Sequence, residues 1–224
     1  MRLLDMEIDA VLLDVDGTLF SSEGIIFQVY EDEFREFHRK YGVPKKIPTL
    51  QEIMAQIGKP VIEIFQNLAP GLAERERDSL SENILNNLVR RIGAGEGDHY
   101  SGVFETVQKL SESGFEIYAA SNGRFPYVNA ILKKNGTLPF FKEVPAIDNV
   151  TIKNKNELVS YILQKYKISP ERAVLIGDRN SDREAALVNG CKFIACSYGH
   201  GDKIEHEGAI FFLDSFPDLL RYVS

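Results

Sequence analysis

The pattern of apolar and polar residues predicts a parallel α/β fold. A continuous apolar run, Ala10–Leu13, is typical of a parallel strand that is buried on both faces. From residue 102 onward, short apolar runs bounded by turn residues alternate with segments of helical period, which indicates βαβ units. Strands are predicted over 115–120, 173–177 and 193–196, and helices over 103–113, 127–134, 156–166 and 182–189.

The segment 22–95 has a different pattern, with no convincing strand. Helices are predicted over 27–41, 50–57, 61–68 and 72–92, separated by breaks at Gly42-Val43-Pro44, Gly58-Lys59-Pro60 and Ala69-Pro70-Gly71. The Gly-rich stretch 93–97 has the composition of a hinge. We therefore predict a Rossmann-like, doubly wound parallel sheet over 1–21 and 96–224, with an α-helical cap, 22–95, inserted after the first strand.

Composition and charge narrow the range of partners. The 224 residues carry a formal net charge of −7, with a pI near 5.2, so no basic field exists to hold nucleic acid. No run approaches the roughly 20 apolar residues of a membrane span. Cys191 and Cys196 lie in or beside one predicted strand, without the spacing of a metal site, so we expect reduced thiols and a cytoplasmic protein.

The first candidate site follows the first strand. Asp14 and Asp16 are separated by one residue and followed by Gly17-Thr18. Both carboxylates are expected to be ionised near pH 7, and their repulsion favours a shared hard cation such as Mg²⁺. An aspartate can also act as a covalent nucleophile towards phosphorus, with a second acid acting on the leaving group.

Three further clusters of polar residues follow predicted strands or begin helices. Ser121-Asn122-Gly123 follows the strand over 115–120 and offers hydrogen-bond donors to a phosphoryl oxygen. Lys153 and Lys155 precede a predicted helix, and either could offset phosphoryl charge. Asp178 ends the strand over 173–177, and Asp182 lies at the start of the next helix.

Taken in order, these motifs resemble those of the haloacid dehalogenase superfamily: DxDGT at Asp14, a serine at Ser121, a lysine, and GDxxxD ending at Asp182. The resemblance implies a Mg²⁺-dependent enzyme in which Asp14 is the nucleophile and Asp16 the general acid and base. It implies phosphate binding by Ser121, Asn122 and a lysine. It also implies that Asp14, the backbone carbonyl of Asp16, and Asp178 hold Mg²⁺, with Asp182 in support.

Relatives place their lysine at the start of the helix before the last catalytic strand. Lys155, followed by Asn-Glu-Leu-Val, fits that register better than Lys153. The common Lys-Pro form is absent, so Lys153 remains the alternative.

The position of the cap resembles the branch that includes phosphoglycolate phosphatases and beta-phosphoglucomutases. That resemblance implies hydrolysis of a small phosphorylated metabolite beneath a closing cap. The Ile57-Gly58-Lys59-Pro60 stretch resembles a cap segment that carries a basic substrate contact, so Lys59 is a candidate; a helix-breaking loop is the alternative reading.

The motifs also bear on the other activities found among proteins with this resemblance. Dehalogenases lack the second acid, and phosphonate-cleaving relatives also depart there, so Asp16 argues against both. A phosphomutase shares all four motifs and stays open. A non-catalytic phosphate-binding module would predict loss of Asp14 or Asp178, and both are present. The motifs leave the substrate and the oligomeric state undetermined.

The four histidines, His38, His99, His200 and His206, lack the partner spacing of a zinc site. We expect them to be solvated surface residues.

Overall fold

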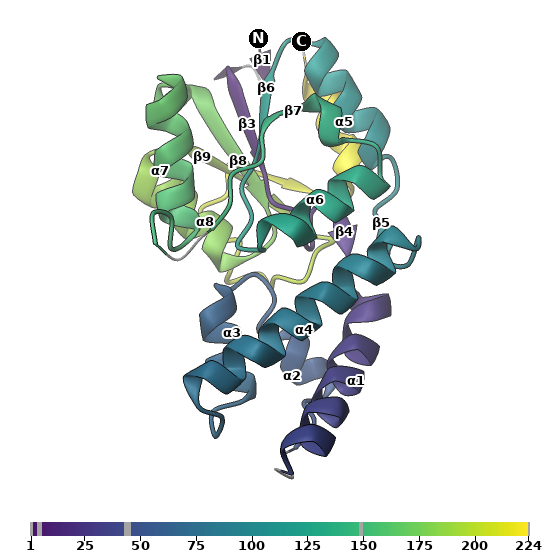
Figure 1. The fold of residues 1–224 in the computed structure, drawn as a ribbon. Coiled ribbons are helices and arrows are strands. Elements are labelled where there is room, and N and C mark those ends of the chain that lie inside the picture. The colour runs from purple at the N-terminus through teal and green to yellow at the C-terminus, as the bar shows by residue number, and fades with distance from the viewer. Residues whose placement is uncertain (1, 4–5, 43–45, 148–149, 224) are drawn as a thin grey trace.

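Six parallel strands form the central sheet of the computed structural model, which describes residues 2–3, 6–42, 46–147 and 150–223 (Figure 1). Their spatial order is β10-β9-β8-β3-β6-β7. The strands are β3 (Ala10–Leu13), β6 (Glu116–Ala119), β7 (Phe141–Glu143), β8 (Ala173–Gly177), β9 (Lys192–Cys196) and β10 (Phe211–Leu213). The prediction of a parallel α/β sheet is confirmed.

Helices cover both faces of this sheet. Successive side chains of a strand point to opposite sides, so both faces present apolar side chains against which helices pack. Leu12 of β3 packs in a cluster with residues of α7 (Lys155–Tyr166) and α8 (Asn180–Asn189). Val11 and Leu13 pack in a second cluster, with α5 (Val103–Glu112), α6 (Phe125–Lys134) and the 3₁₀ segment η3 (Phe216–Tyr222). All four residues of β3 are therefore buried, as its unbroken apolar sequence predicts.

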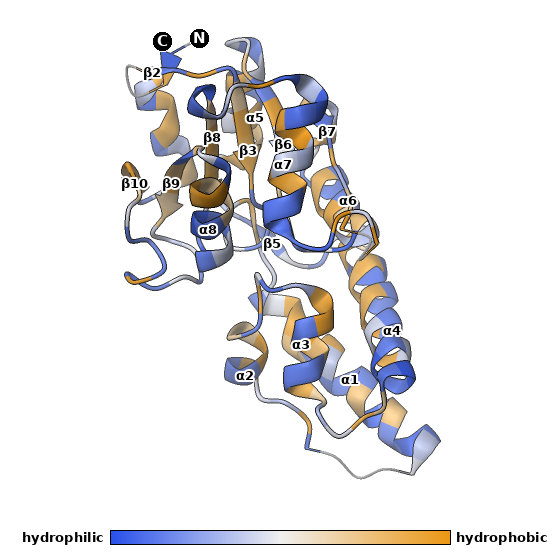
Figure 2. Ribbon diagram, turned by 90° about the vertical axis from the view of Figure 1, so that its left-hand side faces the viewer, coloured by the Kyte–Doolittle hydropathy of each residue, from blue (hydrophilic) through white to orange (hydrophobic). Residues whose placement is uncertain are grey.

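Four helices lie beyond the carboxyl end of the sheet (Figure 1). They are α1 (Glu23–Tyr41), α2 (Leu50–Met54), α3 (Val61–Leu68) and α4 (Glu74–Gly93). Their buried apolar residues belong to the same packed cluster as residues of the sheet. Figure 2 shows apolar segments, in orange, alternating with polar ones, in blue, along these helices. Gly42 ends α1 with a φ of 67°, a left-handed conformation that suits glycine. These helices fall inside the predicted insertion, 22–95.

Several short elements were not predicted. A two-residue ribbon, β4 (Phe20–Ser21) paired antiparallel with β5 (Asp98–His99), links the four helices to the rest. Others are β1 (Arg2–Leu3), β2 (Met6–Glu7), β7, β10, η1 (Leu138–Phe140) and η2 (Pro170–Arg172). Runs of two or three residues are too short to show a period, so only packing reveals them.

The predicted elements differ from the observed ones mainly at their ends. α1 begins at Glu23 instead of residue 27, and α8 begins at Asn180 instead of residue 182. α2 stops at Met54, short of residue 57. Of the predicted break at Gly42-Val43-Pro44, the last two residues lie outside the described ones. Among the residues that the structure describes, no helix combines the length and apolar character that crossing a membrane demands.

His99 lies in the β4–β5 ribbon and is half-buried, so the expectation of a solvated histidine is wrong here. Its ring centroid is 5.2 Å from that of Phe20, which is fully buried. Burial, followed by the nearby charge of Lys134, lowers the pKa of His99 to about 4. The ribbon therefore holds this imidazole neutral at pH 7.

The lowered pKa makes stability depend on pH. The unfolded chain protonates His99 near its ordinary pKa of about 6.5, whereas the folded chain protonates it only near 4. We predict that His99→Gln removes part of the loss of stability that the wild type shows as the pH falls from 7 to 4.5. Urea unfolding at several pH values measures this difference, and parallel stability curves for the two proteins would contradict it.

Candidate active site

The carboxyl ends of three neighbouring strands meet at one level. Leu13 of β3 is in register with Ala119 of β6 on one side and with Ile176 of β8 on the other. Asp14, Ser121 and Asp178 follow these strands within one or two residues. Since ligands of open α/β sheets bind at this edge, the register brings three of the predicted site residues to one place.

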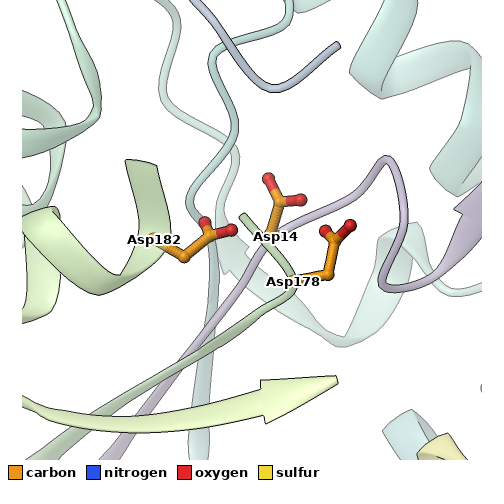
Figure 3. A group of neighbouring side chains, drawn as sticks. All are labelled: Asp14, Asp178 and Asp182. Carbon is orange, nitrogen blue, oxygen red and sulfur yellow. The ribbon is translucent and has the colours of Figure 1, made fainter. Parts of the chain in front are cut away.

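Three buried carboxylates gather there. Asp14, Asp178 and Asp182 offer oxygen atoms that all lie within 4.8 Å of one another, and their side chains converge from β3, β8 and α8 (Figure 3). Asp182 is held in the first turn of α8, where its Oδ2 accepts a hydrogen bond of 2.9 Å from the backbone N–H of Arg179. Asp182 therefore both caps the start of α8 and belongs to the carboxylate cluster.

Lys155 lies between two of these acids. Its Nζ is 2.6 Å from Asp14 Oδ1 and also forms an ion pair with Asp182 Oδ1. It is the first residue of α7, placed there by Asn154, whose side chain accepts a hydrogen bond from the backbone of Glu157. The Lys155 side chain is 2% exposed.

Lys153, the alternative, is exposed. Its backbone N–H donates to Glu157 Oε2 at 2.8 Å. Of the two lysines, Lys155 is the one that contacts Asp14.

Burial makes two carboxylates of this cluster, Asp14 and Asp178, harder to ionise. Desolvation, followed by the charge of Asp182, raises the pKa of Asp14 well above its usual range, while Lys155 opposes the shift. Burial and Asp182 also raise the pKa of Asp178, to about 7. Burial by itself lowers the pKa of Lys155, but Asp14 and Asp182 more than offset it and the pKa is raised. The one ammonium of Lys155 does not fully balance the three carboxylates. A cation bound beside them would favour their ionised forms.

The donor set fits Mg²⁺. Asp178 Oδ1 is buried and has no hydrogen-bond partner within the described residues, whereas its Oδ2 accepts from the backbone N–H of His200 at 2.6 Å. Gly17 closes over this carboxylate with a φ of 83°, and a Cβ there would lie 2.2 Å from Asp178 Oδ2. An orphaned carboxylate oxygen beside Asp14 suits a hard, oxygen-ligated ion.

Asp16 has a partner that the sequence did not reveal. Its Oδ1 accepts a hydrogen bond of 2.9 Å from the hydroxyl of Tyr127, which is buried in the first turn of α6. The pKa of Asp16 is raised, because burial outweighs the hydrogen bond from Tyr127, which lowers it. Tyr127 was predicted only as a helical residue, because 111 positions separate it from Asp16 and nothing local signals the contact.

Ser121 and Asn122 are both buried at the tip of β6. Ser121 Oγ accepts a hydrogen bond of 3.1 Å from the backbone N–H of Gly123, which leaves its own proton available to donate. The Asn122 side chain instead donates to the carbonyl of Gly58, at 2.7 Å. Asn122 still has its backbone N–H, and the second hydrogen of its side-chain amide, as donors for a phosphate oxygen.

A cavity of about 80 Å³ lies above these groups, between the strand ends and helices α1, α3 and α4. Asp14, Asp16, Ser121 and Asn122 line its lower end. Lys59 lines it too, from the loop before α3. The Lys59 ammonium is 3.1 Å from Gln56 Oε1 and 3.3 Å from Glu63 Oε1, so it is already paired.

Two more histidines depart from the expected solvated positions. His206 is 4% exposed, and its Nε2 lies 2.6 Å from the backbone oxygen of Asp178. The His200 side chain is 7% exposed and pairs with Glu23 at 3.2 Å. Both lie in a loop that folds back over Asp178, so closely that a Cβ on Gly201 would lie 1.7 Å from the Asp178 oxygen. His38, the fourth, is partly buried.

The chain matches a known protein family. Residues 11–196 match the model of the haloacid dehalogenase-like hydrolases. The chain belongs to this family. The match runs from β3 to β9 and so includes the three strand tips and the four helices. The protein is therefore a hydrolase, and the resemblance inferred from its motifs is confirmed.

Individual relatives match this chain in sequence over nearly its whole length. The protein is 28% identical over 223 residues to the pyrophosphatase PpaX of Listeria monocytogenes, with 97% of each chain covered. It is 26% identical to the phosphoglycolate phosphatase of Vibrio vulnificus, covering 97% of this chain and 96% of the relative. A structure described as a predicted phosphoglycolate phosphatase from Haemophilus somnus has the same fold, with a TM-score of 0.84, 20% identity, and coverage of 98% and 99%.

The two lysines allow a matched test of the buried ion pairs. We predict that Lys155→Met, measured without Mg²⁺, lowers the free energy of unfolding by about 3–5 kcal/mol, because Asp14 and Asp182 lose their buried partner. Lys153→Met, at an exposed position, is expected to leave it essentially unchanged. Urea denaturation compares them, and equal effects of the two substitutions would refute this view of the cluster.

Proposed function

We propose that the protein is a Mg²⁺-dependent phosphatase that hydrolyses a small phosphomonoester through an aspartyl-phosphate. The observation that carries the proposal is the placement of Asp14 and Asp16 in one cavity, with Lys155 on Asp14 and the carboxylate of Asp178 beside it. Phosphatase names among the relatives support the same reaction. Because both thiols, Cys191 and Cys196, are free, we also propose a cytoplasmic location.

The two acids divide the reaction. Asp14 attacks phosphorus, and a new bond from its carboxylate oxygen replaces the ester P–O bond. Asp16 gives its proton to the departing alkoxide, so that an alcohol leaves. The carboxylate of Asp16 then takes a proton from water, which attacks the aspartyl-phosphate and frees inorganic phosphate. The hydrogen bond from Tyr127 holds Asp16 in place for both transfers.

The phosphoryl group is held by groups at the end of β6 and at the start of α7. Ser121 donates from its hydroxyl, Asn122 from its backbone N–H, and Lys155 places a positive charge next to the nucleophile. Mg²⁺ would be held by Asp14, the backbone carbonyl of Asp16, and Asp178, with Asp182 in support. When bound, the ion supplies charge stabilisation for the phosphoryl oxygens.

Residues 22–95 act in this proposal as the cap over residues 1–21 and 96–224. The contacts that join the two parts include those of Asn122 with Gly58, of Arg124 with Glu82 at 2.7 Å, and of Arg179 with the carbonyl of Met54 at 3.4 Å. They hold the cap against the strand ends, where it excludes water from the aspartyl-phosphate. Lys59 remains a predicted substrate contact.

The nucleophile provides the first test. We predict that Asp14→Asn abolishes phosphate release from a panel of phosphomonoesters, and that Asp16→Asn lowers kcat by about 10²–10⁴-fold, since a general acid contributes that much. Asp78→Asn, at an exposed position of α4, serves as the control. Release that survives Asp14→Asn would refute the mechanism. Conversion of a hexose 1-phosphate to its 6-phosphate without net release would instead assign a phosphomutase.

The metal provides the second test. We predict that chelation with EDTA stops phosphate release and that Mg²⁺ restores it. We also predict that Mg²⁺ raises the thermal unfolding temperature of the wild type more than that of Asp178→Asn, because this substitution removes a carboxylate ligand. Calorimetry with and without Mg²⁺ measures the shift. A shift that is equal in both proteins would place the ion elsewhere.

A further inference from the structure

The upper part of the cavity differs chemically from its catalytic end. Its wall is formed by side chains of α1, α3 and α4 that are nearly all buried. They are Ile26, Ile64, Phe65, Ile84, Leu85 and Leu88. The leaving group of a substrate whose phosphate meets Asp14 and Ser121 must lie against this wall. Burying a charge among such side chains is costly unless a partner compensates it.

Two cations line the cavity, and both are already paired. Arg124 donates to Glu82 at 2.7 Å and to the backbone oxygen of Ser81 at 2.6 Å. Lys59 pairs with Gln56 and Glu63. A second anionic group on the substrate would have to share one of these cations with a carboxylate that repels it. The cavity therefore lacks a ready counter-charge for a carboxylate or a second phosphate.

We infer that the alcohol half of the substrate is short, uncharged and largely apolar. The whole cavity, including the end that Asp14 and Ser121 line, has a volume of about 80 Å³, near half that of an apolar cavity that holds benzene, so the leaving group is limited to a few carbon atoms. This inference rests on the proposed phosphatase function and specifies its substrate class. It departs from the compounds named for the relatives, since pyrophosphate and phosphoglycolate each carry a second anionic group.

A matched pair of esters tests the inference. Butyl phosphate and phosphoglycolate each have four non-hydrogen atoms beyond the ester oxygen, and only the second is charged there. We expect kcat/KM for butyl phosphate to exceed that for phosphoglycolate at least 10-fold. Glu82→Gln should lower this ratio several-fold, because it frees the Arg124 guanidinium to meet a carboxylate. Glu74→Gln, at an exposed position of the same helix, should leave the ratio unchanged.

Binding separates this inference from the proposed chemistry. The Asp14→Asn variant, which is expected not to turn substrate over, should bind butyl phosphate more tightly than phosphoglycolate or pyrophosphate in calorimetric titrations with Mg²⁺. Equal or tighter binding of either charged compound, or a wild-type preference for it, would overturn the inference while leaving the mechanism intact. Phosphate release by Asp14→Asn would instead overturn the mechanism, and the binding order would still decide the substrate class.

Discussion

The ion pairs of Lys155 with Asp14 and Asp182 hold the catalytic end of the molecule together. They join the end of β3, the start of α7 and the start of α8 in one buried contact. Charges removed from water in this way need close partners, because an unpaired ion there costs several kcal/mol. The pairing leaves the cluster short of positive charge, and the carboxylate of Asp178, with one oxygen unpartnered among the described residues, lies where a divalent ion would supply it. In the proposed metal site, stability and metal affinity therefore depend on the same few groups.

The backbone around this cluster is adapted to close approach. Gly17 and Gly177 each lie so near a carboxylate that a Cβ would come within 2.2 Å of Asp178 or Asp182. The loop containing His206 returns over Asp178 and contacts its backbone oxygen. These contacts keep the cluster buried, and burial is the first cause of the raised pKa values of Asp14 and Asp178. The geometry that favours a metal is thus the geometry that makes the acids hard to ionise without one.

In the proposed reaction, chemistry and selectivity come from different parts of the chain. The strand ends supply Asp14, Asp16 and Ser121, and α7 supplies Lys155. The wall that a leaving group would meet comes from α1, α3 and α4. Arg124, which follows the Ser121 loop directly, ties the two parts together through Glu82. Family membership therefore specifies the reaction more closely than the substrate. A cap of similar shape with different wall residues could serve a different ester.

The sequence by itself determined the longer buried strands, the order of the main helices and the places of Asp14 and Asp178 after strands, because apolar runs, helical period and turn residues are local signals. It left Lys153 and Lys155 as alternatives, and the structure shows that Lys155 contacts Asp14. Only the tertiary structure decided which groups meet across long separations. Examples are Tyr127 on Asp16, His206 on Asp178, and the apolar wall of the cavity. His99, His200 and His206 were wrongly expected at the surface for the same reason: burial depends on which loop or strand packs over a residue, and packing between distant segments leaves no periodic trace in the chain.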